Sequence, residues 1–158
     1  MDGYIAFYRG LSWVSKCIRW FTRSEYSHVA YIGGDGCVYE AWRPRVRKTA
    51  NNSEGHKPGT VIDLFRFDIA PTQEESFVQY LESRVGWRYD TRGVLGFISR
   101  RPGAQRDDRL FCSELILEAS RHAHAPLLRL VPAYTVSPGQ LVSSLLLWGC
   151  GSVAVAAD

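Results

Sequence analysis

A cysteine at the start of a predicted helix is the residue of this sequence best placed for chemistry. Residues 110–120 read LFCSELILEAS, in which Leu115, Ile116 and Ala119 have the spacing of one helix face. The polar residues of the segment fall at other positions: Ser113, Glu114 and Glu118. Cys112 would then lie in the first turn, where unpaired backbone N–H groups and the helix dipole favour a thiolate and could hold an oxyanion. The alternative is an inert core thiol, the usual fate of a free cysteine.

A base for such a thiol is available on a predicted β-hairpin. Ser27–Ile32 and Cys37–Trp42 are strand-like runs on either side of the turn sequence GGDG at 33–36. With the pairing centred on residue 34, His28 and Glu40 face each other directly across the hairpin, with Cβ atoms about 4.5–5.5 Å apart. This register requires a bulge or a three-residue loop, because an even loop would turn the partner of His28 to the opposite face.

An imidazole that is oriented by a carboxylate and reaches a thiol is what activated thiol catalysis requires. Each residue also has a structural explanation: His28 as a hydrogen-bonded strand histidine, and Glu40 as an exposed carboxylate at a strand edge. If the register slips, Asp35 in the turn or Asp90 farther along the chain could take the place of Glu40.

The elements that must position these residues indicate an α+β domain. We expect further strands at Tyr4–Tyr8 and Thr60–Phe67 and an amphipathic helix at Leu11–Arg23, whose Trp13, Trp20 and Phe21 either fill the core or rim a site, with the core favoured. A second helix over 72–85 is predicted to be capped by Thr72 and to bury Phe77, Val78, Leu81 and Val85. Ser137-Pro138 predicts the start of a last helix that runs to about Leu147.

Two further segments read as surface. Arg43–Lys48 carries four basic residues directly after the strand that holds Glu40, and we expect a solvated face there. The polar loop Ser99–Arg109 precedes the cysteine helix and could close over a cleft.

Composition narrows the class of protein. The 158 residues form one expected domain, 1–158, with 46% hydrophobic residues, as in ordinary globular chains. A net charge of +3 does not approach that of a nucleic-acid-binding protein, so no nucleic acid partner is expected. The cysteines lack metal-site spacing, so no metal is predicted, and no cofactor is expected. Cys17, Cys37 and Cys150 are assigned to the core because they match none of the family motifs given below. The N-terminus lacks a signal-peptide pattern and no transmembrane segment is predicted, which favours a cytoplasmic location.

Four short motifs, in chain order, resemble one family. SHVAY at 27–31, VYEA at 38–41, GWRYD at 86–90 and FCSEL at 111–115 are similar to the circularly permuted branch of the papain-like NlpC-type cysteine peptidase superfamily, which includes relatives of lecithin retinol acyltransferase and YiiX-like hydrolases. In the permuted branch the histidine precedes the cysteine, as His28 precedes Cys112 here. The resemblance covers most of the chain, and it implies an antiparallel sheet packed against helices.

The resemblance also implies roles for single residues. Cys112 would be the nucleophile, His28 the base and Glu40 the orienting group, and Tyr89 matches the family tyrosine whose hydroxyl helps hold the oxyanion. The implied activity is a thiol hydrolase or acyltransferase acting on a small amide, peptide or acyl substrate, with a lipid-like ligand possible. The alternatives are a non-catalytic papain-like binding module for a lipid-like or peptide ligand and a redox thiol, which the lack of a nearby resolving cysteine disfavours.

Overall fold

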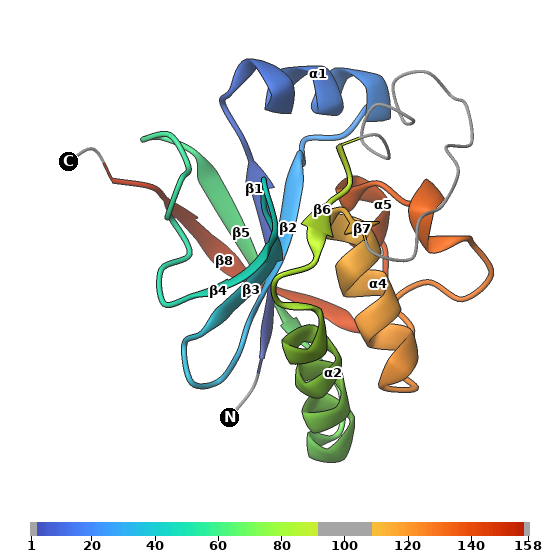
Figure 1. Cartoon of the computed structure of the whole chain (residues 1–158). Coiled ribbons are helices and arrows are strands. Elements are labelled where there is room, and N and C mark those ends of the chain that lie inside the picture. Colours follow the sequence, from blue (N-terminus) through green and yellow to red (C-terminus); the bar gives the residue numbers. More distant parts are fainter. Residues whose placement is uncertain (1–2, 92–108, 157–158) are drawn as a thin grey trace.

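Six strands form one antiparallel sheet in the computed structural model, which describes residues 3–91 and 109–156 (Figure 1). In spatial order the strands are β4 (Val46–Thr49), β3 (Val38–Ala41), β2 (His28–Ile32), β1 (Tyr4–Arg9), β5 (Val61–Phe67) and β8 (Leu147–Ala154). A separate short parallel pair joins β6 (Arg88–Tyr89) to β7 (Arg109–Leu110). The described helices are α1 (Trp13–Thr22), α2 (Pro71–Arg84), α4 (Cys112–His122), α5 (Pro138–Leu141) and the 3₁₀ turn η1 (Ala133–Thr135).

The main core lies between one face of the sheet and helices α2 and α4 (Figure 1). Alternate residues of the central strands, such as Phe7 and Val29, point to this face and are fully buried. Two buried tyrosines also fasten α2 to the sheet, because the Tyr31 hydroxyl donates to Glu74 and the Tyr39 hydroxyl donates to an oxygen of Glu82, each at 2.6 Å. The predicted α+β class with an antiparallel sheet packed against helices is therefore confirmed.

The opposite face of the sheet carries a smaller core. Its buried residues come from the alternate positions of the same strands: Ala6, Tyr8, Ala30, Val38 and Ile62. The backbone pairs Tyr8 with His28 across β1 and β2, so the histidine belongs to this face of its strand. Both faces of the sheet are thus packed. The candidate base, His28, is the first residue of strand β2.

The strands at Tyr4–Arg9 and Val61–Phe67 and the hairpin agree with prediction, but the hairpin register does not. Tyr31 pairs with Tyr39 and Ile32 with Val38, so the centre of pairing is residue 35 rather than 34. The N–H of Gly33 donates to the carbonyl of Cys37 at 2.8 Å, and Gly36 has φ of 81°, which closes a loop of odd length. Glu40 therefore lies opposite Ala30 instead of His28.

The helices differ from prediction in three places. The second helix begins at Pro71 after Ala70, whose N–H donates to Gln73, so Thr72 is not its cap, and Val85 is 41% exposed just beyond its end. The last helix ends at Leu141 instead of near Leu147, and the chain continues into strand β8. This strand forms because the outer edge of β5 offers a full row of backbone partners from Val61 to Phe67.

Two predictions of burial are wrong. Trp13 and Trp20 of α1 are 78% and 74% exposed, and no residue of this helix is buried, so its rings do not fill the core. Cys17 and Cys37 are only partly buried and Cys150 is exposed, so none of them is a core residue. Of the basic run predicted as solvated surface, Arg43, Arg45 and Lys48 are exposed as expected, whereas Val46 of β4 between them is buried. Positions 92–108, which include most of the predicted loop Ser99–Arg109, lie outside the described residues.

Candidate active site

Helix α4 places Cys112 at its first residue. Phe111 precedes it in an extended conformation, with φ −108° and ψ 173°, and the Leu115 N–H donates to the Phe111 carbonyl at 3.0 Å. Cys112 is 4% exposed, so its thiol lies against the core at the end of the helix where backbone N–H groups are unpaired by helix bonds. The predicted start of this helix is confirmed.

The helix is buried on more sides than its sequence pattern indicates. Leu115, Ile116 and Ala119 are fully buried, as predicted. Ser113 and Glu114, expected on a polar side, are buried as well. The Ser113 hydroxyl donates to the Val136 carbonyl at 2.5 Å, which satisfies it within the core. The first turn of α4 is thus enclosed by the strands behind it and by the chain segment that leads to α5.

His28 and Glu40 meet in spite of the shifted register. His28 Nε2 lies 2.5 Å from Glu40 Oε2, and both side chains are buried. Residues two positions apart on paired strands share a face of the sheet, and long side chains can span this diagonal. Direct cross-strand pairing of the two residues was therefore wrong, but the predicted contact is present. Asp35, the alternative in the turn, is exposed and accepts the Cys37 N–H instead.

Arg47 holds the other oxygen of the same carboxylate. Its Nε donates to Glu40 Oε1 at 2.8 Å and its Nη2 lies 2.6 Å from that oxygen. Burial alone would raise the pKa of Glu40, but the interactions with His28 and Arg47 lower it. Arg47 also bonds Glu54 and lies over the Trp42 ring, 4.8 Å from the ring centroid. Glu40 is therefore an ionised carboxylate fixed between an imidazole and a guanidinium.

The imidazole is coupled to the thiol of Cys112. Burial would lower the pKa of His28, but hydrogen bonds with the Cys112 and Glu40 side chains raise it to about 9. Because Nε2 faces Glu40, Nδ1 is the ring nitrogen left for the sulfur. At neutral pH the ring is then protonated, and an adjacent imidazolium favours the thiolate form of a cysteine.

Tyr89 lies within electrostatic range of the same sulfur. Burial is the main cause that raises the pKa of Tyr89, and the charges of Cys112 and Asp90 raise it further, while Arg43 lowers it. The Tyr89 N–H donates to the Pro44 carbonyl at 2.9 Å, which fixes β6 beside the loop before β4. Tyr89 is thus a neutral phenol near the thiol, and a neutral phenol can donate a hydrogen bond.

Aromatic rings enclose the histidine. The ring centroids of Tyr8 and Trp42 lie 5.1 and 5.2 Å from that of His28. His56 stacks on Tyr8 at 4.2 Å and lies 5.5 Å from His28, although it comes from the loop between β4 and β5. This loop is held down because the Tyr8 hydroxyl donates to the Asn52 carbonyl at 2.9 Å. The rings exclude water from the histidine and restrict its rotation.

The sequence does not identify His56, Arg47, Tyr8 and Trp42 as parts of this site. His56 is a single histidine in a loop, and a loop position carries no periodicity that would assign its direction. Arg47 belongs to a basic run that reads as solvated surface. The alternation of strand residues does give one signal, since Arg47 lies directly opposite Glu40 in the β3–β4 pairing.

Three of these side chains could also hold a metal ion. One ligand atom each of His28, Glu40 and His56 lie within 4.8 Å of one another, in the part of the chain that the structure describes. His56 Nε2 is buried and has no hydrogen-bond partner. Burial, together with the charge of His28, lowers the pKa of His56 to about 4, so its ring is a neutral donor. Two imidazoles and a carboxylate are a donor set that zinc accepts.

One solved structure has a similar fold. The fold is YiiX-like. The crystal structure of the metalloprotein yiiX (DUF1105) from Escherichia coli O157:H7 matches with a TM-score of 0.70 over 96% of each chain, at 20% sequence identity. At this identity the similarity shows a shared fold alone. No protein-family model matches the chain, and no curated protein matches it either. Among the described residues, no helix is long and apolar enough to cross a bilayer.

Proposed function

We propose that this protein is a thiol hydrolase or acyltransferase of the circularly permuted papain-like type, acting on a small amide, peptide or acyl ester. The observation that carries the proposal is the buried contact of 2.5 Å between His28 and Glu40, together with the hydrogen bond of Cys112 that raises the pKa of His28. A nucleophile, a base and a group that orients the base are the parts that acyl transfer through a thioester needs.

In the proposed reaction the Cys112 thiolate adds to the substrate carbonyl carbon, and the carbonyl oxygen becomes an oxyanion. The N–H groups at the start of α4 and the Tyr89 hydroxyl are the donors available to that oxyanion. The intermediate then collapses to a thioester, and His28 gives its proton to the departing amine or alkoxide. Water, or an acceptor amine, next attacks the thioester, His28 takes up the proton of the nucleophile, and the thiolate leaves.

Glu40 is the positioning residue of this scheme. Its ionised carboxylate accepts from Nε2 and keeps Nδ1 turned to the sulfur. Because Arg47 neutralises the second oxygen, the carboxylate stays ionised within the core without taking the proton from His28. The likeness to yiiX supports the fold of this proposal only.

The test compares two cysteines of the same chain. Cys112→Ala is expected to abolish hydrolysis of an activated acyl ester or amide, whereas Cys150→Ala, which removes an exposed thiol, should retain it. A thioester trapped on Cys112 and identified by mass spectrometry would support the route directly. Selective modification of Cys112 without any turnover of a panel of acyl substrates would favour the rival interpretation, a binding module that uses the same residues.

A second candidate function, binding of a divalent cation, is favoured by the buried and unpaired Nε2 of His56. His28, Glu40 and His56 would hold the ion, which would act as a Lewis acid. The contact of 2.5 Å between His28 and Glu40 and the guanidinium on Glu40 both oppose a cation there, so the thiol route is preferred. Zinc titration by calorimetry separates the two: a cation site requires binding that His56→Ala removes, whereas the thiol route predicts turnover that survives treatment with a chelator.

A further inference from the structure

Helix α1 exposes the apolar side chains that an ordinary surface helix would bury. Its large apolar side chains point to solvent, with exposed fractions of 78% for Trp13, 56% for Val14, 74% for Trp20 and 42% for Phe21. The half-buried residues of the helix are Ser15, Cys17, Ile18, Arg19 and Thr22. A surface helix normally buries its apolar stripe against the core. Here no residue that the structure describes covers the stripe, and Ser15, Ile18 and Thr22 are half-buried instead.

Polar contacts define both ends of the helix and join it to the residue that follows β1. Ser12 caps the first turn by accepting the Ser15 N–H at 3.1 Å, and the Arg19 guanidinium donates to the Gly10 carbonyl at 3.4 Å. Arg23, in a left-handed conformation with φ of 51°, ends the helix with its N–H bonded to the carbonyls of the last turn. The helix that carries the exposed stripe is therefore a defined element of the fold.

Cations border the apolar stripe. Lys16 and Arg23 are exposed, Arg19 is half-buried, and residues 11–24 contain no aspartate or glutamate. The next acidic residue, Glu25, is paired with Arg9 at 3.1 Å. Helices that lie in a membrane interface typically carry indole rings on one face and basic residues beside them, as α1 does with Trp13 and Trp20 seven residues apart.

We propose that α1 docks the protein on an anionic lipid membrane, lying in the plane of the headgroups with Trp13, Val14, Trp20 and Phe21 in the acyl boundary. The ammonium and guanidinium groups of Lys16 and Arg23 would bind the lipid phosphates. This surface is independent of the proposed chemistry, and it lies on the same side of the molecule as the site. Figure 1 shows α1 above the end of the sheet at which β2 begins with His28.

A second copy of the chain fits this surface less well than a membrane does. A helix of 10 residues is about 15 Å long. It therefore offers much less than the roughly 800 Å² per partner of a stable protein interface. Two copies meeting face to face would also bring Lys16 and Arg23 against the same cations of the partner. An anionic bilayer has neither limit, because it is extended and carries the opposite charge.

The experiment measures sedimentation of the full chain with lipid vesicles. The wild type should bind vesicles that mix phosphatidylglycerol with phosphatidylcholine, and should bind pure phosphatidylcholine weakly. Trp13→Ala combined with Trp20→Ala should reduce the partition coefficient about tenfold or more, since two exposed rings lose their apolar burial in lipid. Lys16→Glu combined with Arg23→Glu should remove the preference for phosphatidylglycerol.

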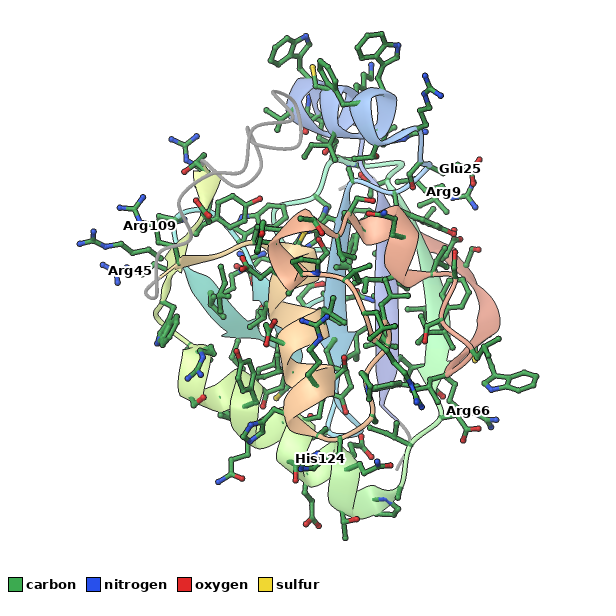
Figure 2. All side chains as sticks on the ribbon, turned by 90° about the vertical axis from the view of Figure 1, so that its right-hand side faces the viewer. Arg9, Glu25, Arg45, Arg66, Arg109 and His124 are labelled. Atoms are coloured by element: carbon green, nitrogen blue, oxygen red, sulfur yellow. The ribbon has the colours of Figure 1, made fainter. Side chains whose placement is uncertain are left out.

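The matched control is Trp148→Ala. Trp148 is 59% exposed and pairs with Arg66 across β8 and β5. Figure 2 shows Arg66 in a part of the sheet far from α1, and it shows side chains of α1 projecting away from the body of the molecule. This variant should bind vesicles as the wild type does, and all variants should keep the thermal midpoint because they remove exposed groups. Failure of the wild type to bind anionic vesicles, or equal binding by the Trp13/Trp20 variant, would overturn the proposal. Self-association of the wild type that the Trp13/Trp20 variant abolishes would also overturn the proposal, because it would show that α1 forms a dimer interface.

Discussion

The buried carboxylate of Glu40 sets the charge state of the candidate site. One of its oxygens contacts the imidazole of His28, and the other contacts the guanidinium of Arg47. An ionised group in a nearly dry environment is tolerated only when such partners compensate its lost hydration. The same pairing raises the pKa of His28, so the orientation and the protonation of the ring depend on one residue.

Glu40→Gln tests this dependence at the scale of one atom pair. The amide keeps the shape of the side chain but loses the negative charge, so the pKa of His28 should fall below its value of about 9, as an NMR titration of the ring would measure. Turnover should drop by about 10²- to 10⁴-fold, the usual contribution of acid–base catalysis, while substrate binding survives.

Asp35→Asn is the control for that change, because Asp35 is exposed in the hairpin turn and contacts the Cys37 N–H. It should leave both turnover and the pKa of His28 at their wild-type values. An unchanged His28 titration in Glu40→Gln, or a loss of turnover in Asp35→Asn alone, would mean that Glu40 does not position the base.

Helix α4 contains a second buried acid, whose environment is the opposite of that of Glu40. Burial raises the pKa of Glu114 to about 7, and the nearby charges of Asp90 and Glu118 add to this, while a backbone hydrogen bond with Phe111 lowers it. A raised pKa means that the folded state holds a proton that the unfolded state releases. Folding is therefore favoured at low pH by this group, and the contribution is lost as pH rises from about 4.5 to about 7.

Glu114→Gln should therefore stabilise the protein at pH 8 and change its stability little at pH 4. A shift from 4.5 to about 7 corresponds to on the order of 3–4 kcal/mol, at about 1.4 kcal/mol per pKa unit. Urea unfolding at the two pH values measures it. The control is Glu75→Gln, which removes an exposed carboxylate on α2 and should change the stability by no more than about 0.5 kcal/mol at either pH. A destabilised Glu114→Gln at pH 8 would mean that the buried acid is ionised and paired.

At the scale of elements, the sequence predicts helices and strands well, but it predicts poorly how they pair and which of their faces is buried. Strand alternation and a glycine-rich turn were enough to place β1, β2, β3 and β5. The predicted centre of the hairpin pairing was wrong by one residue, because four turn residues in a row permit more than one loop length. The side chains of His28 and Glu40 still met, since their offset kept them on one face.

The orientation of α1 and the fate of the C-terminal segment needed tertiary information. Helical periodicity shows that Trp13 and Trp20 share a face, but it does not say whether that face meets the core or the solvent. Ser137-Pro138 fixes where a helix begins and carries nothing about its length. The chain forms β8 from Leu147 onward because the edge of β5, far away in sequence, is available for pairing.

At the scale of the whole molecule, one buried carboxylate joins four separate segments. Asp63 of β5 binds Arg9 of β1 through Nε at 2.9 Å and Nη2 at 2.8 Å, and it accepts the Tyr26 hydroxyl at 2.8 Å. Its second oxygen accepts the Ser152 hydroxyl of β8. Tyr26 belongs to the connection from α1 to β2, so this network ties the outward-facing helix and the C-terminal strand to the centre of the sheet. It lies apart from the Cys112 site, and its disruption should act on stability.

Asp63→Asn should destabilise the protein by about 1–3 kcal/mol at pH 7, because it replaces a charge-assisted set of hydrogen bonds with neutral ones. Burial alone would raise the pKa of Asp63, but the bonds from Ser152, Tyr26 and Arg9 lower it. A lowered pKa gives stability that is present above the unfolded value of 3.8 and is lost as pH falls through the folded value. The difference between wild type and Asp63→Asn should therefore be full at pH 7 and shrink below about pH 4. Denaturant unfolding across this range measures it, with Asp68→Asn, at an exposed position directly after this strand, as a variant that should match the wild type. A difference that stays constant down to the lowest pH would show that the charge of Asp63 contributes nothing and that only the shape of its side chain holds the four segments together.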